Sequence, residues 1–246
     1  MDITAKTALI TGAAQRIGAA IARLLHTEGM QLLLHYRRSA GAAEALRDEL
    51  NGLRPDSVAL AQADLCRVEQ LPGLVDQVQA RFGGLDLLVN NASSFYATPI
   101  GGVDEASWDD LMGSNLKGPF FLSQAAAPLL AERQGCIINL VDIHAERPKA
   151  GFAVYSMAKA GNAMLVKALA RELGPQVRVN GIAPGIILWP DQTMSPADKE
   201  ALLQRTALQR AGVEQDIART LLFLLRDAPY ITGQIIAVDG GRTLQQ

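Results

Sequence analysis

The sequence predicts an α/β fold: a doubly wound (Rossmann) seven-stranded parallel sheet with helices on both faces. Short apolar runs rich in β-branched residues alternate with longer stretches of helical period along the 246 residues. Such alternation favours parallel strands joined by right-handed crossovers. The runs are apolar at consecutive positions, which is typical of strands covered on both faces. No Pro/Gly/Ser-rich linker interrupts the pattern, so we expect a single domain over residues 1–246.

Each predicted strand is a short run dominated by Val, Ile, Leu and Ala, and each predicted helix repeats apolar residues three or four positions apart. The predicted strands are Thr7–Thr11, Gln31–His35, Val58–Ala61, Leu85–Asn90, Cys136–Val141, Val177–Ile182 and Ile235–Val238. The predicted helices are Ile17–Glu28, Ala42–Leu50, Gln70–Arg81, Trp108–Glu132, Val154–Leu173 and Val213–Arg226. The irregular stretch Pro184–Pro196 is long for a compact domain, which indicates a substrate loop at about residues 184–207.

Composition excludes several classes of protein. A formal charge of −2 gives no electrostatic reason to expect a nucleic-acid or polybasic membrane surface. No apolar run reaches the roughly 18 residues that span a bilayer, and the N-terminal residues do not resemble a secretory signal. Cys66 and Cys136 stand alone, outside any metal-binding spacing, and we expect no metal. A reducing cytoplasm is the expected location.

The first predicted strand runs into a glycine-bearing turn that opens a helix. In a dinucleotide-binding fold one glycine makes this turn, another lets the helix pack on the sheet, and free N–H groups at the helix start bind the pyrophosphate. The alternative is an ordinary strand-to-helix turn, but a second strand follows where the motif requires it. The residues concerned are Gly12, Arg16, Ile17 and Gly18.

The second predicted strand ends without the acidic residue that holds the ribose 2′-hydroxyl group of NAD. Arg37 and Arg38 stand there instead, and Arg16 faces the same end of the sheet. Guanidinium groups suit a 2′-phosphate, so the sequence predicts NADP(H), the alternative being solvated surface charges. Asp64 after the third strand is placed to accept a hydrogen bond from adenine, or is an exposed turn residue. Further expected contacts are His35, Tyr36, Ser39 and Leu65.

Tyr155 and Lys159 lie four residues apart at the start of a predicted helix, one turn from each other on one face. A lysine cation near a phenol lowers the pKa of the phenol, so we expect Tyr155 to release a proton near neutral pH. Three other motifs accompany this pair. Asn90-Asn91-Ala92 follows the fourth predicted strand, Asn115 lies in the next predicted helix, and Pro184-Gly185 follows the sixth predicted strand.

With these motifs the chain resembles the short-chain dehydrogenase/reductase family over essentially its whole length. The resemblance implies hydride transfer from nicotinamide, with Tyr155 as proton donor, Lys159 holding the nicotinamide ribose and Asn115 supporting a water chain to Lys159. It also implies a homotetramer formed through the two long helices and the segment Ile235–Leu244. The resemblance adds cofactor contacts at Asn91, Ala92, Ser93, Pro184 and Gly185.

Two positions depart from the general family pattern. Arg16 stands where the family usually has its middle glycine, and Asp142 stands thirteen residues before Tyr155, where the family has a serine. Serine suffices for a ketone, because the oxygen needs only hydrogen bonds. Reduction of a C=N bond leaves a basic nitrogen that must be protonated, and a carboxyl group coupled to Tyr155 can serve that relay. The alternative is an inactive or altered member of the family.

These departures resemble one branch of the family, the pteridine reductases. In that branch the segment similar to Asn91–Tyr96 carries a phenylalanine that stacks on the flat pterin ring, which corresponds to Phe95 here, unless Phe95 belongs to the core. Ser93 is placed to reach both pterin and cofactor. The remaining expected substrate contacts are Asp142, Tyr155, Leu188 and Trp189.

The sequence therefore predicts an NADPH-dependent reductase of dihydropterins, with dihydrofolate as a further candidate substrate. The alternatives are a carbonyl or 3-oxoacyl reductase of the same family and a non-catalytic module that senses NADPH. Of the three histidines, His26 is expected at the surface. His35 borders either the 2′-phosphate or the adenosine, and His144 is expected in solvent without a catalytic role.

Overall fold

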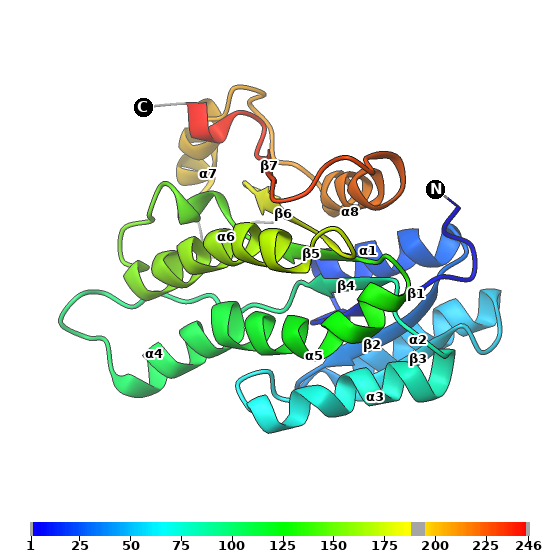
Figure 1. The fold of residues 1–246 in the computed structure, drawn as a ribbon. Coiled ribbons are helices and arrows are strands. Elements are labelled where there is room, and N and C mark those ends of the chain that lie inside the picture. The colour runs from blue at the N-terminus through cyan, green and yellow to red at the C-terminus, as the bar shows by residue number, and fades with distance from the viewer. Residues whose placement is uncertain (1, 188–194, 245–246) are drawn as a thin grey trace.

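The computed structural model describes residues 2–187 and 195–244, and it confirms the predicted fold class (Figure 1). Seven parallel strands form one sheet in the order β3-β2-β1-β4-β5-β6-β7. The strands are β1 (Thr7–Ile10), β2 (Gln31–Tyr36), β3 (Val58–Gln62), β4 (Leu87–Asn90), β5 (Cys136–Leu140), β6 (Arg178–Pro184) and β7 (Ile235–Val238). The strand order reverses between β1 and β4, and in open α/β sheets ligands bind in the crevice at such a switch point.

Helices cover both faces of the sheet. The helices are α1 (Arg16–Thr27), α2 (Ala40–Leu53), α3 (Leu71–Phe82), α4 (Glu105–Met112), α5 (Gly118–Glu132), α6 (Ala153–Leu173), α7 (Pro196–Gln204) and α8 (Glu214–Leu222). Buried residues of α1, α2 and α8 pack with one face, and those of α3, α5 and α6 with the other. Successive residues of β1 point to opposite faces of the sheet: Leu9 packs with the residues of α3, α5 and α6, and Ile10 packs with those of α1, α2 and α8. This explains the continuous apolar strands.

The predicted helix over 108–132 is interrupted. A π-helical turn at Gly113–Lys117 separates α4 from α5. Both of its flanking glycines pass close to the end of β3: a Cβ atom on Gly113 would lie 2.8 Å from Sγ of Cys66, and one on Gly118 would lie 2.8 Å from the carbonyl oxygen of Leu65. The turn carries Asn115 into the protein interior, and π-helical turns are frequent at functional sites.

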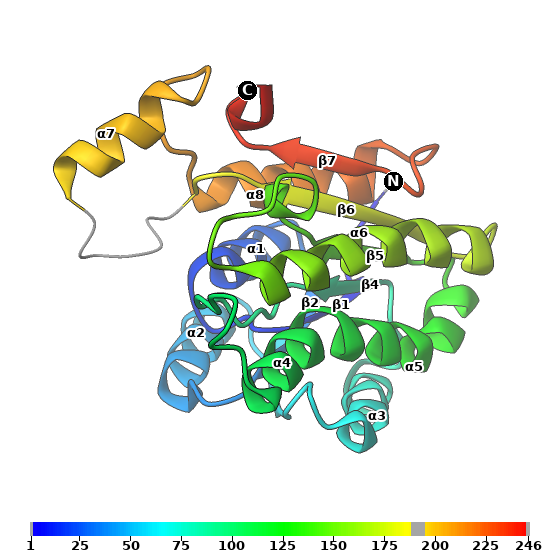
Figure 2. The same cartoon turned by 90° about the vertical axis from the view of Figure 1, so that its left-hand side faces the viewer.

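Within the predicted substrate loop, helix α7 begins at Pro196, where the predicted irregular stretch ends, and stands away from the sheet beyond the end of β6 (Figure 2). One further sequence prediction is wrong. His26 is buried, not at the surface, and its Nε2 atom lies 2.8 Å from Oγ of Ser57. His26 follows the buried Ala22 by four residues and therefore shares its inward face.

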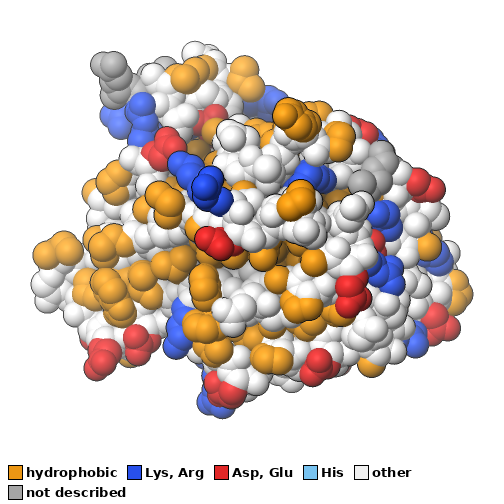
Figure 3. All heavy atoms as spheres, in the orientation of Figure 1, with side chains coloured by type: hydrophobic (Ala, Val, Ile, Leu, Met, Phe, Trp, Pro, Cys, Tyr) orange, Lys and Arg blue, Asp and Glu red, His pale blue; other side chains and the backbone are white. Residues whose placement is uncertain are grey.

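Hydrophobic side chains gather on the face formed by α4, α5 and α6 (Figure 3). Trp108, Phe120, Met157 and Met164 are exposed there. Within the part of the chain that the structure describes, no helix has the length and apolar character needed to cross a membrane.

Candidate active site

The glycine-rich turn after β1 is held against the segment that follows β4. Oγ1 of Thr11 accepts hydrogen bonds from the backbone N–H groups of Asn91 and Ala92, at 2.9 and 3.0 Å. The side-chain amide of Asn91 donates to the carbonyl oxygens of Thr11 and Gly12, at 2.9 and 3.0 Å. The crevice at the switch point is thus built by two loops that brace each other.

The glycines of this turn are required by close approaches. Gly12 has φ +60°, and a Cβ atom there would lie 2.9 Å from Cα of Ala92. A Cβ atom on Gly18 would collide with the carbonyl oxygen of Gly12 and lie 2.7 Å from Nδ2 of Asn91. Arg16 has φ +55°, in the left-handed region that favours glycine. This explains why the family usually has glycine where this chain has Arg16.

This cradle fits a dinucleotide. Among the described residues no side chain caps α1 at Gln15, so the first N–H groups of α1 are available to a phosphate at the positive end of the helix. Ile17 is half-buried and packs against the core below. The residues present, with Gly12 and Gly18 leaving room for the approach, are those that would hold the pyrophosphate.

His35 lies beneath this turn and shapes it. Its ring is buried; Nδ1 accepts a 3.2 Å hydrogen bond from the N–H group of Gly12, and Nε2 lies 3.1 Å from the carbonyl oxygen of Ala63, to which it donates. Burial lowers the pKa of His35, which agrees with a neutral ring in this arrangement. The structure therefore places His35 as a support of the glycine-rich turn.

The two adjacent arginines after β2 have different surroundings. The guanidinium group of Arg37 forms ion pairs with Asp64 at 3.1 Å and with Asp110 of α4 at 3.0 Å. Arg38 is exposed and lines a surface depression of about 450 Å³. Arg67 lines the same depression and was not predicted, because no motif marks it. The remaining lining residues are Arg37, Gln62, Ala63, Asp64 and Gln70.

Tyr155 and Asp142 meet at the carboxyl end of β5. The Tyr155 hydroxyl group donates a 2.7 Å hydrogen bond to Oδ2 of Asp142, whose Oδ1 atom accepts one of 2.8 Å from the backbone N–H group of His144. The Lys159 ammonium group donates to the carbonyl oxygen of Leu140 at 2.8 Å and lies 5.7 Å from the centre of the Tyr155 ring. The structure thus brings Asp142, Tyr155 and Lys159 together.

The prediction that the pKa of Tyr155 is lowered is wrong. Burial raises the pKa of Tyr155, and the charge and hydrogen bond of Asp142 raise it further. The carboxylate lies in direct contact with the hydroxyl group and opposes its ionisation. Burial also lowers the pKa of Lys159 to about 8, although Asp142 partly opposes that change. The site therefore holds a protonated phenol beside a lysine that titrates near neutral pH.

Asn115 is fully buried at one end of a polar chain. Its Oδ1 atom accepts a 2.6 Å hydrogen bond from Ser93, and its backbone carbonyl oxygen accepts one of 2.8 Å from Asn162. Asn162 in turn accepts from Asn139 at 2.8 Å, and Asn139 accepts from Asn90 at 2.9 Å. Asn139 and Asn162 were missed, because a polar residue inside an apolar strand or helix was their only signal.

Phe95 forms an aromatic wall beside Tyr155 and does not belong to the core, since 39% of it is exposed. Its ring stacks on Phe152, with centres 4.7 Å apart, and meets Tyr155 edge-on at 4.8 Å. The ammonium group of Lys149 lies 4.1 Å from the centre of the Phe152 ring and 5.0 Å from that of Phe95. Phe152 and Lys149 were not predicted. Of the other expected contacts, Leu188 and Trp189 lie outside the described residues.

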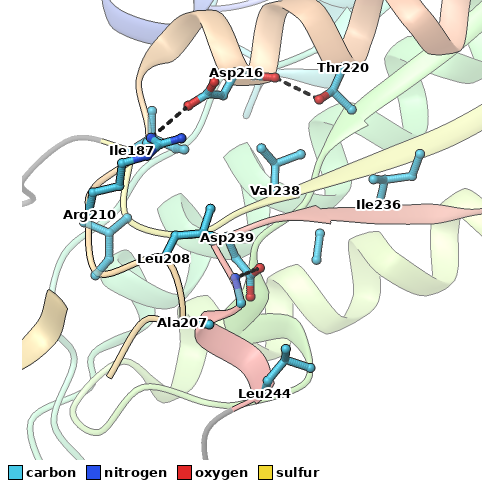
Figure 4. Close-up of a pocket in the computed structure, with 15 residues that line it drawn as sticks. Ile187, Ala207, Leu208, Arg210, Asp216, Thr220, Ile236, Val238, Asp239 and Leu244 are labelled. Atoms are coloured by element: carbon cyan, nitrogen blue, oxygen red, sulfur yellow. Dashed lines mark hydrogen bonds and ion pairs between the residues drawn. The ribbon is translucent and has the colours of Figure 1, made fainter. Parts of the chain in front are cut away.

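A larger pocket, of about 660 Å³, lies between β7, α8 and residues 206–212 (Figure 4). Its lining is mainly aliphatic and contains none of the predicted catalytic or cofactor-binding residues. It adjoins the end of β6 through Ile186 and Ile187. Gly185 lies just before them, where a Cβ atom would approach Cα of Asp239 to 2.6 Å. The strand end after Pro184 is therefore packed tightly against the segment after β7.

Known proteins are similar to this chain over nearly its full length. A family model described as enoyl-(acyl carrier protein) reductase matches residues 12–243. Pteridine reductase 1 of Leishmania tarentolae is 37% identical over 281 aligned positions, covering 98% of this chain and 97% of that protein. A 3-oxoacyl-(acyl-carrier-protein) reductase of Staphylococcus aureus is 40% identical over 241 positions, covering 96% and 97%. The 3beta-hydroxysteroid dehydrogenase 1 of Eggerthella lenta is 37% identical over 256 positions, covering 99% and 95%.

Proposed function

The chain belongs to the short-chain dehydrogenase/reductase family of oxidoreductases, and we propose that it is an NADPH-dependent pteridine reductase. It would reduce a C=N bond of a dihydropterin, such as dihydrobiopterin or dihydromonapterin, to the tetrahydro form, with dihydrofolate as a further substrate. The observation that carries this proposal is the 2.7 Å hydrogen bond between Tyr155 and Asp142, at the position where the family has a serine.

The chemistry requires one hydride at carbon and one proton at nitrogen. When bound, the reduced nicotinamide supplies the hydride. Tyr155 remains protonated because of its raised pKa and gives its proton to the nitrogen, directly or through water. Asp142 contacts the same hydroxyl group and stabilises the phenol against ionisation until the basic nitrogen is present. Lys159, which carries a proton below about pH 8, would then return a proton to Tyr155 through water, and Asn115 would support that water chain.

The aromatic wall supports a planar substrate. Phe95 is exposed beside Tyr155, so its ring offers area to a flat heterocycle within reach of the proton donor. Ser93 is held by Asn115 at 2.6 Å at the edge of the same site. An acyl chain can bury apolar area against this ring but cannot stack on it as a flat heterocycle does.

For the cofactor we propose NADPH, with the 2′-phosphate held by Arg16, Arg38 and Ser39. Arg38 supports this because it is exposed in the depression at the end of β2, which Arg37 and Arg67 also line. The further proposed cofactor contacts are His35, Tyr36, Arg37, Asp64, Leu65, Asn91, Ala92, Ser93, Tyr155, Lys159, Pro184 and Gly185. The exposed hydrophobic face of α4, α5 and α6 supports a homotetramer (Figure 3), and we further propose a cytoplasmic location.

A carbonyl or 3-oxoacyl reductase is the second candidate, favoured by the 40% identity to the Staphylococcus aureus protein. NADPH oxidation measured in parallel with dihydrobiopterin, dihydromonapterin, dihydrofolate and a 3-oxoacyl thioester separates the two candidates. A pteridine reductase turns over at least one pterin or folate with a higher kcat/KM than the thioester. The reverse order replaces the first candidate by the second, and no turnover of any of the four would favour the NADPH-sensing module.

A further inference from the structure

A chain of polar contacts leaves the end of β2 and reaches the aromatic wall. Arg37 donates from Nη1 to Oδ1 of Asp110 at 3.0 Å. Oδ2 of the same carboxylate lies 3.2 Å from the hydroxyl group of Tyr96, which also lies 3.3 Å from the carbonyl oxygen of Ser107. Tyr96 is the neighbour of Phe95. One carboxylate on α4 therefore joins an arginine at the cofactor crevice to the loop that carries the proposed stacking residue.

The other end of this chain lies at the adenosine side of the cradle. The Nη2 atom of Arg37 pairs with Asp64 at 3.1 Å, and Asp64 also accepts a 3.0 Å hydrogen bond from the N–H group of Cys66. Two carboxylates thus fix the plane of the guanidinium group from two directions, and both are only 27% exposed. Such a plane is suited to pack against a flat base as well as to carry charge.

A second contact ties the loop to the same turn of α4. The backbone N–H group of Ser94 lies 3.3 Å from Oγ of Ser114, and that hydroxyl group donates to the carbonyl oxygen of Asp110 at 2.7 Å. Although burial opposes it, hydrogen bonds from Ser94, Arg37 and Tyr96 lower the pKa of Asp110. The Asp110 carboxylate is therefore charged at neutral pH and can accept hydrogen bonds from both Arg37 and Tyr96.

We propose that Arg37, Asp110 and Tyr96 form a positioning bridge that couples the adenosine half of the dinucleotide to the order of the loop at residues 91–99, which carries Phe95. Ligand contacts at the adenosine side reduce the motion of the Arg37 side chain. The ion pair with Arg37 then holds Asp110 in one position, and the hydrogen bond from Tyr96 to Asp110 holds Tyr96 and its neighbour Phe95. Coupling of this kind is a free energy shared by two sites, so removal of one link must weaken it. In this role Arg37 differs from Arg38, although the two are adjacent in sequence. The bridge requires only the adenosine half of the dinucleotide and no pterin, so it is tested separately from the proposed reaction.

The test is amide hydrogen exchange of the loop with and without 2′,5′-ADP, which provides the adenosine and 2′-phosphate but cannot reach the substrate. Peptides covering residues 95–99 are followed in wild type, Asp110→Asn and Tyr96→Phe. Asp109→Asn is the matched control, because Asp109 is the exposed neighbour of Asp110 on the same helix. Calorimetric titration of 2′,5′-ADP establishes that each variant is folded and saturated with ligand.

In wild type and Asp109→Asn we expect 2′,5′-ADP to slow exchange in the loop by about fivefold, the lower end of typical couplings. In Asp110→Asn and Tyr96→Phe the slowing should fall to less than half of that factor while 2′,5′-ADP still binds. Absence of slowing in wild type overturns the proposal, and so does its full retention in either bridge variant.

Discussion

The Tyr155 hydroxyl group donates its hydrogen bond directly to the carboxylate of Asp142, at 2.7 Å. The residues come from different elements, the end of β5 and the first turn of α6, and the sheet topology brings them together. A serine at position 142 would leave a neutral hydroxyl group beside the phenol, whereas the carboxylate raises the pKa of Tyr155. Tyr155 therefore keeps its proton until a sufficiently basic acceptor is bound. The nitrogen of a C=N bond is a more basic acceptor than a carbonyl oxygen, so this arrangement favours reduction of C=N.

The pH dependence of activity should follow Lys159 rather than Tyr155. The pKa of Lys159 lies at about 8, so its charge is present below pH 8 and is lost as the pH rises through that value. Tyr155 stays protonated across the same range because its pKa is raised. We expect kcat/KM to fall on the alkaline side with a midpoint near 8. In Lys159→Arg, whose side chain keeps its charge, that fall should move to higher pH. A midpoint that stays in place in Lys159→Arg would assign the fall to another group.

Phe95→Ala should raise the KM for a pterin by about fivefold and change kcat less, because stacking on an aromatic ring contributes on the order of 1 kcal/mol. Steady-state kinetics with dihydrobiopterin measures the effect. Phe223→Ala is the control, since Phe223 is similarly exposed but follows α8 on the opposite face of the sheet. An unchanged KM in Phe95→Ala would remove this residue from the substrate site.

Arg38→Ala should weaken NADPH binding by about tenfold or more, as expected for loss of a charge-assisted hydrogen bond, and leave NADH binding unchanged. Fluorescence titration of both nucleotides provides the two dissociation constants. Arg47→Ala is a suitable control, because Arg47 lies on α2 and pairs with Asp48. Equal losses for NADPH and NADH would show that Arg38 does not contact the 2′-phosphate.

The buried asparagine chain should contribute to stability. Asn139→Ala removes the donor to Asn162 and the acceptor for Asn90, and leaving buried polar groups unpaired costs about 1 to 3 kcal/mol each. Denaturant unfolding should show a loss of that size. The double variant with Asn162→Ala should lose less than the sum of the two single variants, since both break the same hydrogen bond. Additive losses would indicate that the two residues act independently.

The sequence was sufficient for the fold because strands, helices and the glycine-rich turn each have a local signature. Tyr155 and Lys159 were also found, since they lie one turn apart on a predicted helix, and Asp142 was found because the family resemblance marks the position thirteen residues before Tyr155. Contacts between distant segments have no such signature. The ion pair of Arg37 with Asp110 spans 73 residues, and the burial of His26 depends on Ser57 at the start of β3. The raised pKa of Tyr155 likewise depends on its depth, which spacing does not encode.

The break between α4 and α5 shows the same limit. Periodicity continues through Gly113 and Gly118, so a single long helix was predicted. The π-helical turn forms because both glycines pass against the segment after β3, and this contact exists only in the folded sheet. Asn115 was identified by its motif, but its burial and its link to Asn162 required the structure.

The most direct test of the central claim is the ratio of kcat/KM for a dihydropterin to that for a 3-oxoacyl thioester, measured in wild type and Asp142→Ser with NADPH. If Asp142 and Tyr155 form the relay to nitrogen, the substitution lowers pterin turnover by about 100-fold, the lower limit typical of general acid catalysis, and lowers thioester turnover much less. An unchanged ratio between the two substrates would contradict the assignment of Asp142 to C=N reduction.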